Sequence, residues 1–142
     1  MNSASRRNEK KTNVMGFLKN IFGSSEPKDE KILPWIFLDD IQQLDFIEEK
    51  SKTKPQLIFK HSTRCGISRM VMRQFEAQYP FNSDNVDLYY LDLLTYRDIS
   101  NTIAQRFGVF HESPQLLVVK NGVVVTAASY GAINDLELST LL

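Results

Sequence analysis

From Ile32 onward, short apolar runs alternate with stretches of helical periodicity, and this alternation constrains the fold more than any other feature of the chain. Three apolar runs of strand composition, at residues 35–38, 56–60 and 86–93, are each followed by a helical pattern. Strands that alternate with helices are joined by crossover connections and run parallel. The sequence therefore predicts an α/β domain.

The helical patterns have recognisable starts and ends. The first helix follows Asp39 or Asp40, either of which can cap it. The second begins after Cys65, with apolar residues at i+4 spacing. The third spans residues 97–107, and Gly108 is expected to end it as a left-handed C′ residue.

The last third of the chain shows a different pattern. Asn121-Gly122 separates two β-branched runs, residues 116–119 and 123–125, and this is a strong hairpin signal. Residues 134–137 have capping-box spacing and are expected to open a short C-terminal helix. A hairpin added to parallel strands predicts a central mixed sheet with helices on both faces.

Charge divides the chain into two parts. Residues 1–31 hold 7 Lys and Arg against 4 Asp and Glu, whereas residues 32–142 hold 10 against 13. We interpret residues 1–31 as a flexible basic tail or linker and residues 32–142 as the folded domain. The tail contains a short apolar segment, residues 16–22, that is too short for us to expect membrane contact, and Met15 is an alternative start.

Composition excludes several classes of protein. The net charge is zero, so we expect no nucleic-acid partner. A single cysteine rules out a domain stapled by its own disulfides. The two histidines and the cysteine lack metal-ligand spacing, so we expect no metal. The sequence shows no membrane span and no signal-peptide core, and we expect a cytoplasmic location.

Cys65 is the candidate nucleophile. It lies between a strand pattern and a helix pattern, where the unpaired N–H groups and the helix dipole favour negative charge. Arg64 and Arg69 are close in sequence and add positive charge. We therefore expect Arg64, Gly66 and Ser68 to stabilise a Cys65 thiolate. The alternative is that Cys65 packs only as a small buried hydrophobic residue, but polar or small residues flank it on both sides.

Ser68 stands three residues after the cysteine, where dithiol versions of this arrangement carry a second cysteine. A hydroxyl can donate a hydrogen bond to a thiolate, but it cannot attack sulfur. The cycle therefore needs a thiol from outside the chain. Cys65 would take a small thiol from a mixed disulfide, and a second small thiol would release it.

Ser113 and Pro114 form a second candidate feature. A proline just before a strand is usually trans, but its place between the third helix and the hairpin favours a cis bond here. We expect Ser113, Pro114, Thr63 and His111 to line a substrate groove beside the cysteine. His61 is a candidate base, although a structural role is the commoner one for a histidine at a strand end.

Three segments carry a family resemblance. Residues 59–68 read Phe-Lys-His-Ser-Thr-Arg-Cys-Gly-Ile-Ser, residues 107–115 read Phe-Gly-Val-Phe-His-Glu-Ser-Pro-Gln, and residues 120–122 read Lys-Asn-Gly. Together they resemble the monothiol bacilliredoxin family, a thioredoxin-like family related to general stress proteins of low-GC bacteria. The resemblance covers residues 33–142.

The resemblance implies a thioredoxin-like fold and a disulfide reductase. Its activity would be removal of bacillithiol, or a similar low-molecular-weight thiol, from mixed disulfides on cytosolic proteins. By position, Cys65 is the attacking residue, Ser68 fills the resolving place and Pro114 is the cis-proline. The small thiol is a co-substrate, and no bound cofactor is implied. Gly66 departs from the family, which usually has proline there.

Two other functions stay open at this point. A non-catalytic thioredoxin-fold module would use the groove beside Pro114 to hold peptides. A thiol peroxidase is suggested by Ser62-x-x-Cys65, but Ile58 stands where that motif requires proline.

Overall fold

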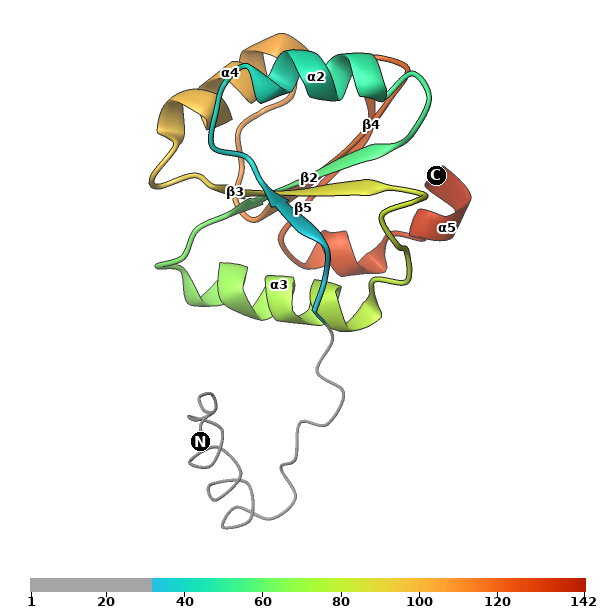
Figure 1. Ribbon diagram of the computed structural model, residues 1–142. Coiled ribbons are helices and arrows are strands. Elements are labelled where there is room, and N and C mark those ends of the chain that lie inside the picture. Colours follow the sequence, from blue (N-terminus) through green and yellow to red (C-terminus); the bar gives the residue numbers. More distant parts are fainter. Residues whose placement is uncertain (1–31) are drawn as a thin grey trace, which may run out of the picture. The chain divides into compact units, whose positions relative to one another are not determined.

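The computed structural model of the protein describes residues 32–142 (Figure 1). The predicted order of strands and helices is confirmed, with a 3₁₀ helix, η1, added before the last helix. The elements are β1 (Trp35–Phe37), α2 (Gln43–Lys50), β2 (Gln56–His61), α3 (Gly66–Gln78), β3 (Asp87–Asp92), α4 (Arg97–Phe107), β4 (Gln115–Lys120), β5 (Val123–Ser129), η1 (Tyr130–Asp135) and α5 (Leu138–Leu141).

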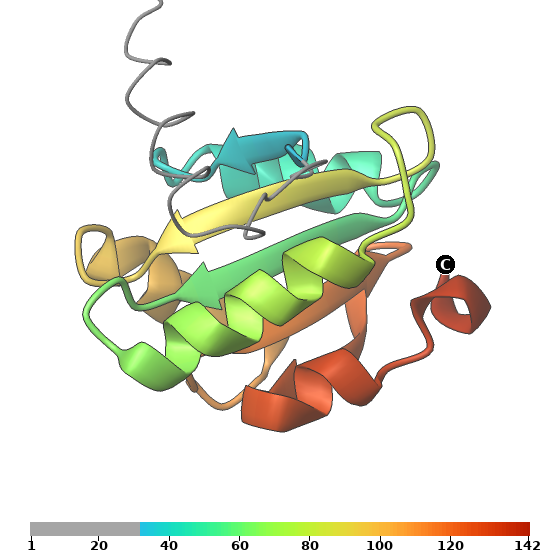
Figure 2. The ribbon, with the colours of Figure 1, turned by 90° about the horizontal axis from the view of Figure 1, so that it is seen from below.

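The five strands form one mixed sheet in the order β1-β3-β2-β4-β5. β1 and β2 run parallel to β3, whereas β4 runs antiparallel to both β2 and β5. In this register Lys60 lies opposite Gln115 and His61 lies opposite Asp92. The end of β2 therefore meets the start of β4, and the views in Figures 1 and 2 show the two strands side by side.

Helices cover both faces of the sheet, as expected. α2 and α4 lie over one face, and α3 and η1 over the other (Figure 1). Successive residues of β2 alternate between the two cores: Leu57 and Phe59 pack on the α3 side, and Ile58 packs on the α2 and α4 side. The same alternation directs Lys60 toward α4 and His61 toward α3.

The start of α2 differs from the prediction of an aspartate cap. The helix begins at Gln43, and the side-chain oxygen of Gln43 accepts hydrogen bonds from the backbone N–H groups of Asp39 (2.8 Å) and Asp40 (2.9 Å). The Asp40 carboxylate accepts from the Gln42 N–H at 2.9 Å, so Asp40 serves a donor at the helix start although Gln42 holds the N-cap position. Ile41 precedes the helix and is exposed rather than buried.

The hairpin turn is confirmed at Asn121 and Gly122. Both residues have positive φ, 54° and 81°, which is the conformation that Asn-Gly favours in a two-residue turn. Their N–H groups donate to the carbonyl and the hydroxyl of Ser51, each at 2.8 Å. The turn is therefore fastened to the end of α2.

The predicted capping box at residues 134–137 is wrong. Asn134 lies inside η1, and α5 begins only at Leu138. The Asn134 side-chain amide donates instead to the Val71 carbonyl and to Gln74, both at 3.2 Å. Contact with α3, which lies far away in sequence, thus replaces the local cap.

The compact unit that contains the sheet spans Leu33–Leu142. The predicted basic tail, its apolar segment at residues 16–22 and the alternative start at Met15 lie outside the described residues and stay predictions. Within residues 32–142, the helices are all too short or too polar to span a bilayer.

Candidate active site

Cys65 occupies the N-cap position of α3, at the point where the chain leaves β2 and enters the helix. Its backbone is extended, with φ −100° and ψ 123°, and its side chain is partly buried. Its N–H donates to the Ser62 carbonyl, and its carbonyl accepts the first helical bond from the Arg69 N–H, both at 3.1 Å. The thiol therefore lies at the positive end of the helix dipole while keeping access to solvent.

The Arg69 guanidinium contacts the cysteine loop, residues 62–65. Its Nη1 donates to the Thr63 carbonyl at 3.2 Å. Its Nη2 lies 3.9 Å from the place that a Cβ on Gly66 would occupy. The side chain thus folds back over the first turn of α3. Arg64, which we expected to stabilise the thiolate, is exposed, as is Arg69.

Ser68 is completely buried, and its hydroxyl connects the two ends of the cysteine loop. The Ser68 oxygen accepts a hydrogen bond from the Ser62 N–H (3.1 Å) and lies 2.7 Å from His61 Nδ1. A hydroxyl has one proton and two lone pairs, so the tautomer of His61 decides whether Ser68 donates to Nδ1 or accepts from it. A Ser68 oxygen that accepts from both neighbours keeps its proton for the predicted bond to a Cys65 thiolate.

His61 is buried at the end of β2. Its ring lies against Tyr90, with centroids 5.6 Å apart, and near Phe59. Burial lowers the pKa of His61; Arg69 lowers it further, and Asp92 opposes the change. The hydrogen bond between the buried imidazole and Ser68 favours a structural role for His61, which was the commoner of the two expectations.

The Ser113–Pro114 peptide bond is cis. The Pro114 carbonyl accepts a hydrogen bond from the Tyr130 N–H at 3.0 Å, and the pairing of Lys60 with Gln115 brings Pro114 to the end of β2. The Ser113 hydroxyl is buried and has no hydrogen-bond partner among residues 32–142. The proline loop, residues 109–113, and the cysteine loop, residues 62–65, therefore flank the same end of the sheet.

His111 belongs to the same proline loop, but its Nδ1 nitrogen already contacts two polar side chains. His111 Nδ1 lies 3.1 Å from the Lys60 ammonium and 3.0 Å from the Ser100 hydroxyl. The Lys60 side chain is fully buried, and this burial lowers the pKa of Lys60 to about 8, against the opposing charge of Glu112. Sequence patterns did not single out Lys60 or Ser100, although a lysine inside an otherwise apolar strand was a usable signal.

Apolar side chains are exposed around this end of the molecule. Ile67 and Met70, in the first turns of α3, are 55% and 52% exposed, and Phe110, in the proline loop, is 90% exposed. We expected Ile67 to share the buried face of the helix. It is exposed because only the later apolar residues of α3, from Val71 onward, reach the core.

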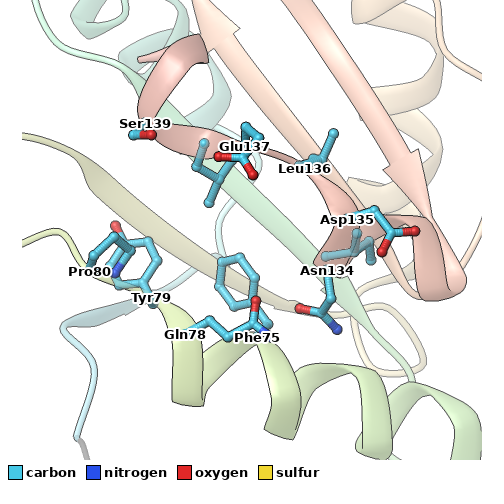
Figure 3. Close-up of a pocket in the computed structure, with 11 residues that line it drawn as sticks. Phe75, Gln78, Tyr79, Pro80, Asn134, Asp135, Leu136, Glu137 and Ser139 are labelled. Atoms are coloured by element: carbon cyan, nitrogen blue, oxygen red, sulfur yellow. The ribbon is translucent and has the colours of Figure 1, made fainter.

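A pocket of about 260 Å³ lies at the other end of α3, lined by the end of that helix and by the segment from Ile133 to Ser139 (Figure 3). A helix of 13 residues is about 20 Å long, so the pocket and Cys65 are separated by roughly that distance. Within residues 32–142, no group of three or more His, Cys, Asp or Glu side chains is placed to hold a metal ion.

The family model described as monothiol bacilliredoxin BrxC matches residues 36–138. The matched segment includes the cysteine loop, the proline loop and all five strands except the first residue of β1.

Solved structures show the same fold. A protein described as having a thioredoxin fold is 34% identical to the chain, with a TM-score of 0.63 over 75% of this chain and 91% of that one. Thioredoxin NaTrxh from Nicotiana alata is 25% identical, with a TM-score of 0.56 over 84% and 96% of the two chains. Thioredoxin from Trypanosoma brucei brucei, 16% identical with a TM-score of 0.58 over 78% and 93%, shares the fold. The expected thioredoxin-like fold is thus confirmed.

Proposed function

Because the chain belongs to the monothiol bacilliredoxin family, whose members share a thioredoxin fold, we propose that it is a monothiol disulfide reductase. Its substrates are cytosolic proteins that carry bacillithiol or a similar low-molecular-weight thiol in a mixed disulfide. Cys65 is the nucleophile, and a second molecule of the small thiol is the co-substrate.

The position of Cys65 is the observation that carries this proposal. Thiol–disulfide exchange requires a sulfur that can ionise and that a disulfide can reach. Cys65 lies at a helix N-cap, is partly exposed, and shares one end of the sheet with the cis-proline loop. The attacking species is the thiolate, and the sulfur lies at the N-terminal end of α3, in the loop that the Arg69 guanidinium contacts. The exposed surface of Ile67, Met70 and Phe110 suits a protein as the bulky half of the substrate.

The reaction has two exchange steps. In the first, the Cys65 thiolate attacks the sulfur of the small thiol, the mixed disulfide breaks, and the target protein leaves as a thiolate that takes a proton from solvent. In the second, a small-molecule thiolate attacks the adduct, the Cys65 thiolate leaves, and a symmetric small-molecule disulfide forms. In total, one incoming small-molecule thiol is oxidised for each target sulfur that is reduced, and Cys65 is regenerated.

The residues around the cysteine divide the remaining work. The Ser68 hydroxyl, hydrogen-bonded to His61 and to the Ser62 N–H, holds the loop of residues 62–65 in place. The backbone of Ser113, next to Pro114, is available to an extended chain at the edge of the groove. These roles are part of the proposal.

The test is adduct formation at Cys65, read by intact-protein mass spectrometry. The protein is exposed in turn to oxidised bacillithiol, oxidised glutathione and the disulfide of coenzyme A. We expect one adduct per chain and a preference for one of the three. Cys65→Ser should form no adduct and should lose all activity on a protein that carries the preferred thiol.

Ser62→Ala is a matched control, because it removes a hydroxyl from the same loop while leaving the backbone N–H that Ser68 uses. It should retain adduct formation. Activity of Cys65→Ser on a thiolated protein would contradict the catalytic assignment. Failure of all three disulfides to react with the native protein would contradict the proposed reaction itself.

A further inference from the structure

The proline loop, residues 109–113, is held to the rest of the molecule by side chains from four different elements, β2, α4, β4 and β5. Lys60 of β2 and Ser100 of α4 both contact His111 Nδ1. The Gln115 side chain donates to the Phe110 carbonyl at 2.9 Å, and the Ser129 hydroxyl donates to the Glu112 carboxylate. We call Lys60, Ser100 and His111 the lysine–histidine cluster.

The lysine–histidine cluster lies on the opposite face of the sheet from α3. Lys60 and His61 are neighbours on β2, and their side chains alternate between the two faces. Lys60 is therefore directed away from the helix that Cys65 caps. Any effect of Lys60 on exchange must pass through the proline loop.

The protonation state of His111 Nδ1 decides whether Lys60 and His111 can form their hydrogen bond, which is the closed state of the cluster. A neutral imidazole has one lone pair, and at Nδ1 it can accept from the Lys60 ammonium. When Nδ1 takes a proton, the lone pair is lost and two cations face each other at hydrogen-bond distance. Acid therefore replaces an attraction by a repulsion.

The charged groups around the cluster favour the closed, neutral-imidazole state at neutral pH. Burial, Lys60 and Arg97, at the start of α4, lower the pKa of His111, and Glu112, in the loop itself, opposes them. Glu112 also faces Lys60 and favours its charged form. Protonation of His111 thus requires a pH below its ordinary pKa of 6.5.

We propose that the lysine–histidine cluster is a proton-controlled clasp that holds Ser113 and Pro114 in position for the substrate, which makes His111 a positioning residue. The clasp is closed at neutral pH and opens in acid. Its effect on activity rests on the proposed function, whereas its effect on the loop does not.

The first test measures the loop without any reaction. Backbone amide shifts of Phe110, Glu112 and Ser113 are followed by NMR from pH 5 to pH 7, below the pKa of Lys60, in the native protein and in His111→Asn. Asparagine keeps an acceptor near the place of Nδ1 but does not titrate. We expect the three amides to titrate together in the native protein and to stay flat in His111→Asn. Flat amides in the native protein, or equal titration in both, would overturn the clasp.

The second test measures exchange. The rate on a thiolated protein is divided by the rate of alkylation with iodoacetamide, so that ionisation of Cys65 cancels. Below the pH at which His111 titrates, we expect this ratio to fall about tenfold or more in the native protein, as for a misplaced binding group. His111→Asn should keep the high ratio at every pH, and His111→Ala and Lys60→Met should show the low ratio throughout.

Lys120→Met is the matched control, because Lys120 is a half-buried lysine on β4 whose ammonium donates to the Leu141 carbonyl at 3.0 Å. It should leave the ratio unchanged. An unchanged ratio in His111→Ala would refute the positioning role. If the native protein fails to act on any thiolated protein, the proposed function fails, and the NMR titration still decides the clasp.

Discussion

Lys60 and His61, adjacent residues at the end of β2, secure two loops on opposite faces of the same sheet. His61 is hydrogen-bonded to Ser68, which supports the cysteine loop, and Lys60 is hydrogen-bonded to His111 of the proline loop. The first pair joins an imidazole to a hydroxyl and carries no formal charge. The second joins two bases that compete for protons. The comparison teaches that one strand end can secure two loops by different means, one through an uncharged pair and the other through a pair that acid can disrupt.

The largest expected effect separates the two pairs by stability. Ser68→Ala leaves His61 Nδ1 and the Ser62 N–H without their partner, and we expect a loss of about 2–3 kcal/mol in the free energy of unfolding. Ser100→Ala is the matched change on the other face. It should cost less than about 1 kcal/mol, because Lys60 still bonds to His111. Urea denaturation measures both, and equal losses would break the comparison.

The next effect is a pH slope that belongs to the lysine alone. The pKa of Lys60 is about 8 in the folded state and 10.5 in the unfolded state, so the unfolded state holds more protons between these values. The free energy of unfolding therefore rises with pH, by on the order of 1–2 kcal/mol between about pH 8 and 9.5. The window ends below pH 10 because burial raises the pKa of Tyr89 from 10.0 to about 12. Above pH 10 the folded state therefore holds the tyrosine proton that the unfolded state has lost, and the free energy of unfolding falls with pH.

Lys60→Met should abolish this slope, and Lys120→Met should preserve it. Denaturation curves at several pH values across the window measure the slope directly. A slope that survives in Lys60→Met would show that another group is its source.

The smallest expected effect concerns the cysteine loop only. Gly66 is the first residue of α3, where proline is favoured, and Cys65 before it already has the extended backbone that a following proline requires. Gly66→Pro should therefore stabilise the protein by about 0.4–1 kcal/mol. Thermal denaturation tests this, with Gly131→Pro, in η1, as a comparison outside the cysteine loop. A loss of stability in Gly66→Pro would show that the loop needs glycine.

Much of the fold could be predicted because it rests on local patterns. The apolar runs, the Asn121-Gly122 turn and the left-handed Gly108 each act within a few residues, and the structure has all of them. The predicted starts of α2 and α5 were wrong. α2 begins at Gln43, whose own side chain folds back onto the N–H groups of Asp39 and Asp40, and the contact of Asn134 with α3 displaced the start of α5.

The candidate site divides in the same way. The position of Cys65 at a helix start followed from the junction of two patterns. The bond between Lys60 and His111 joins residues 51 apart, and it depends on the pairing of β2 with β4, which periodicity does not reveal. A polar residue inside an apolar strand signals that a partner is needed, but it does not identify the partner.

The single cysteine has a consequence for how the protein can be observed. Since no second sulfur in the chain can displace a bound thiol, each oxidised molecule carries its adduct until an external thiol arrives. The mass of the intact chain then reports a simple occupancy, either loaded or empty. Under the proposed function, the fraction of loaded chains in a cell extract would report the balance between oxidised and reduced small thiols at the moment of quenching.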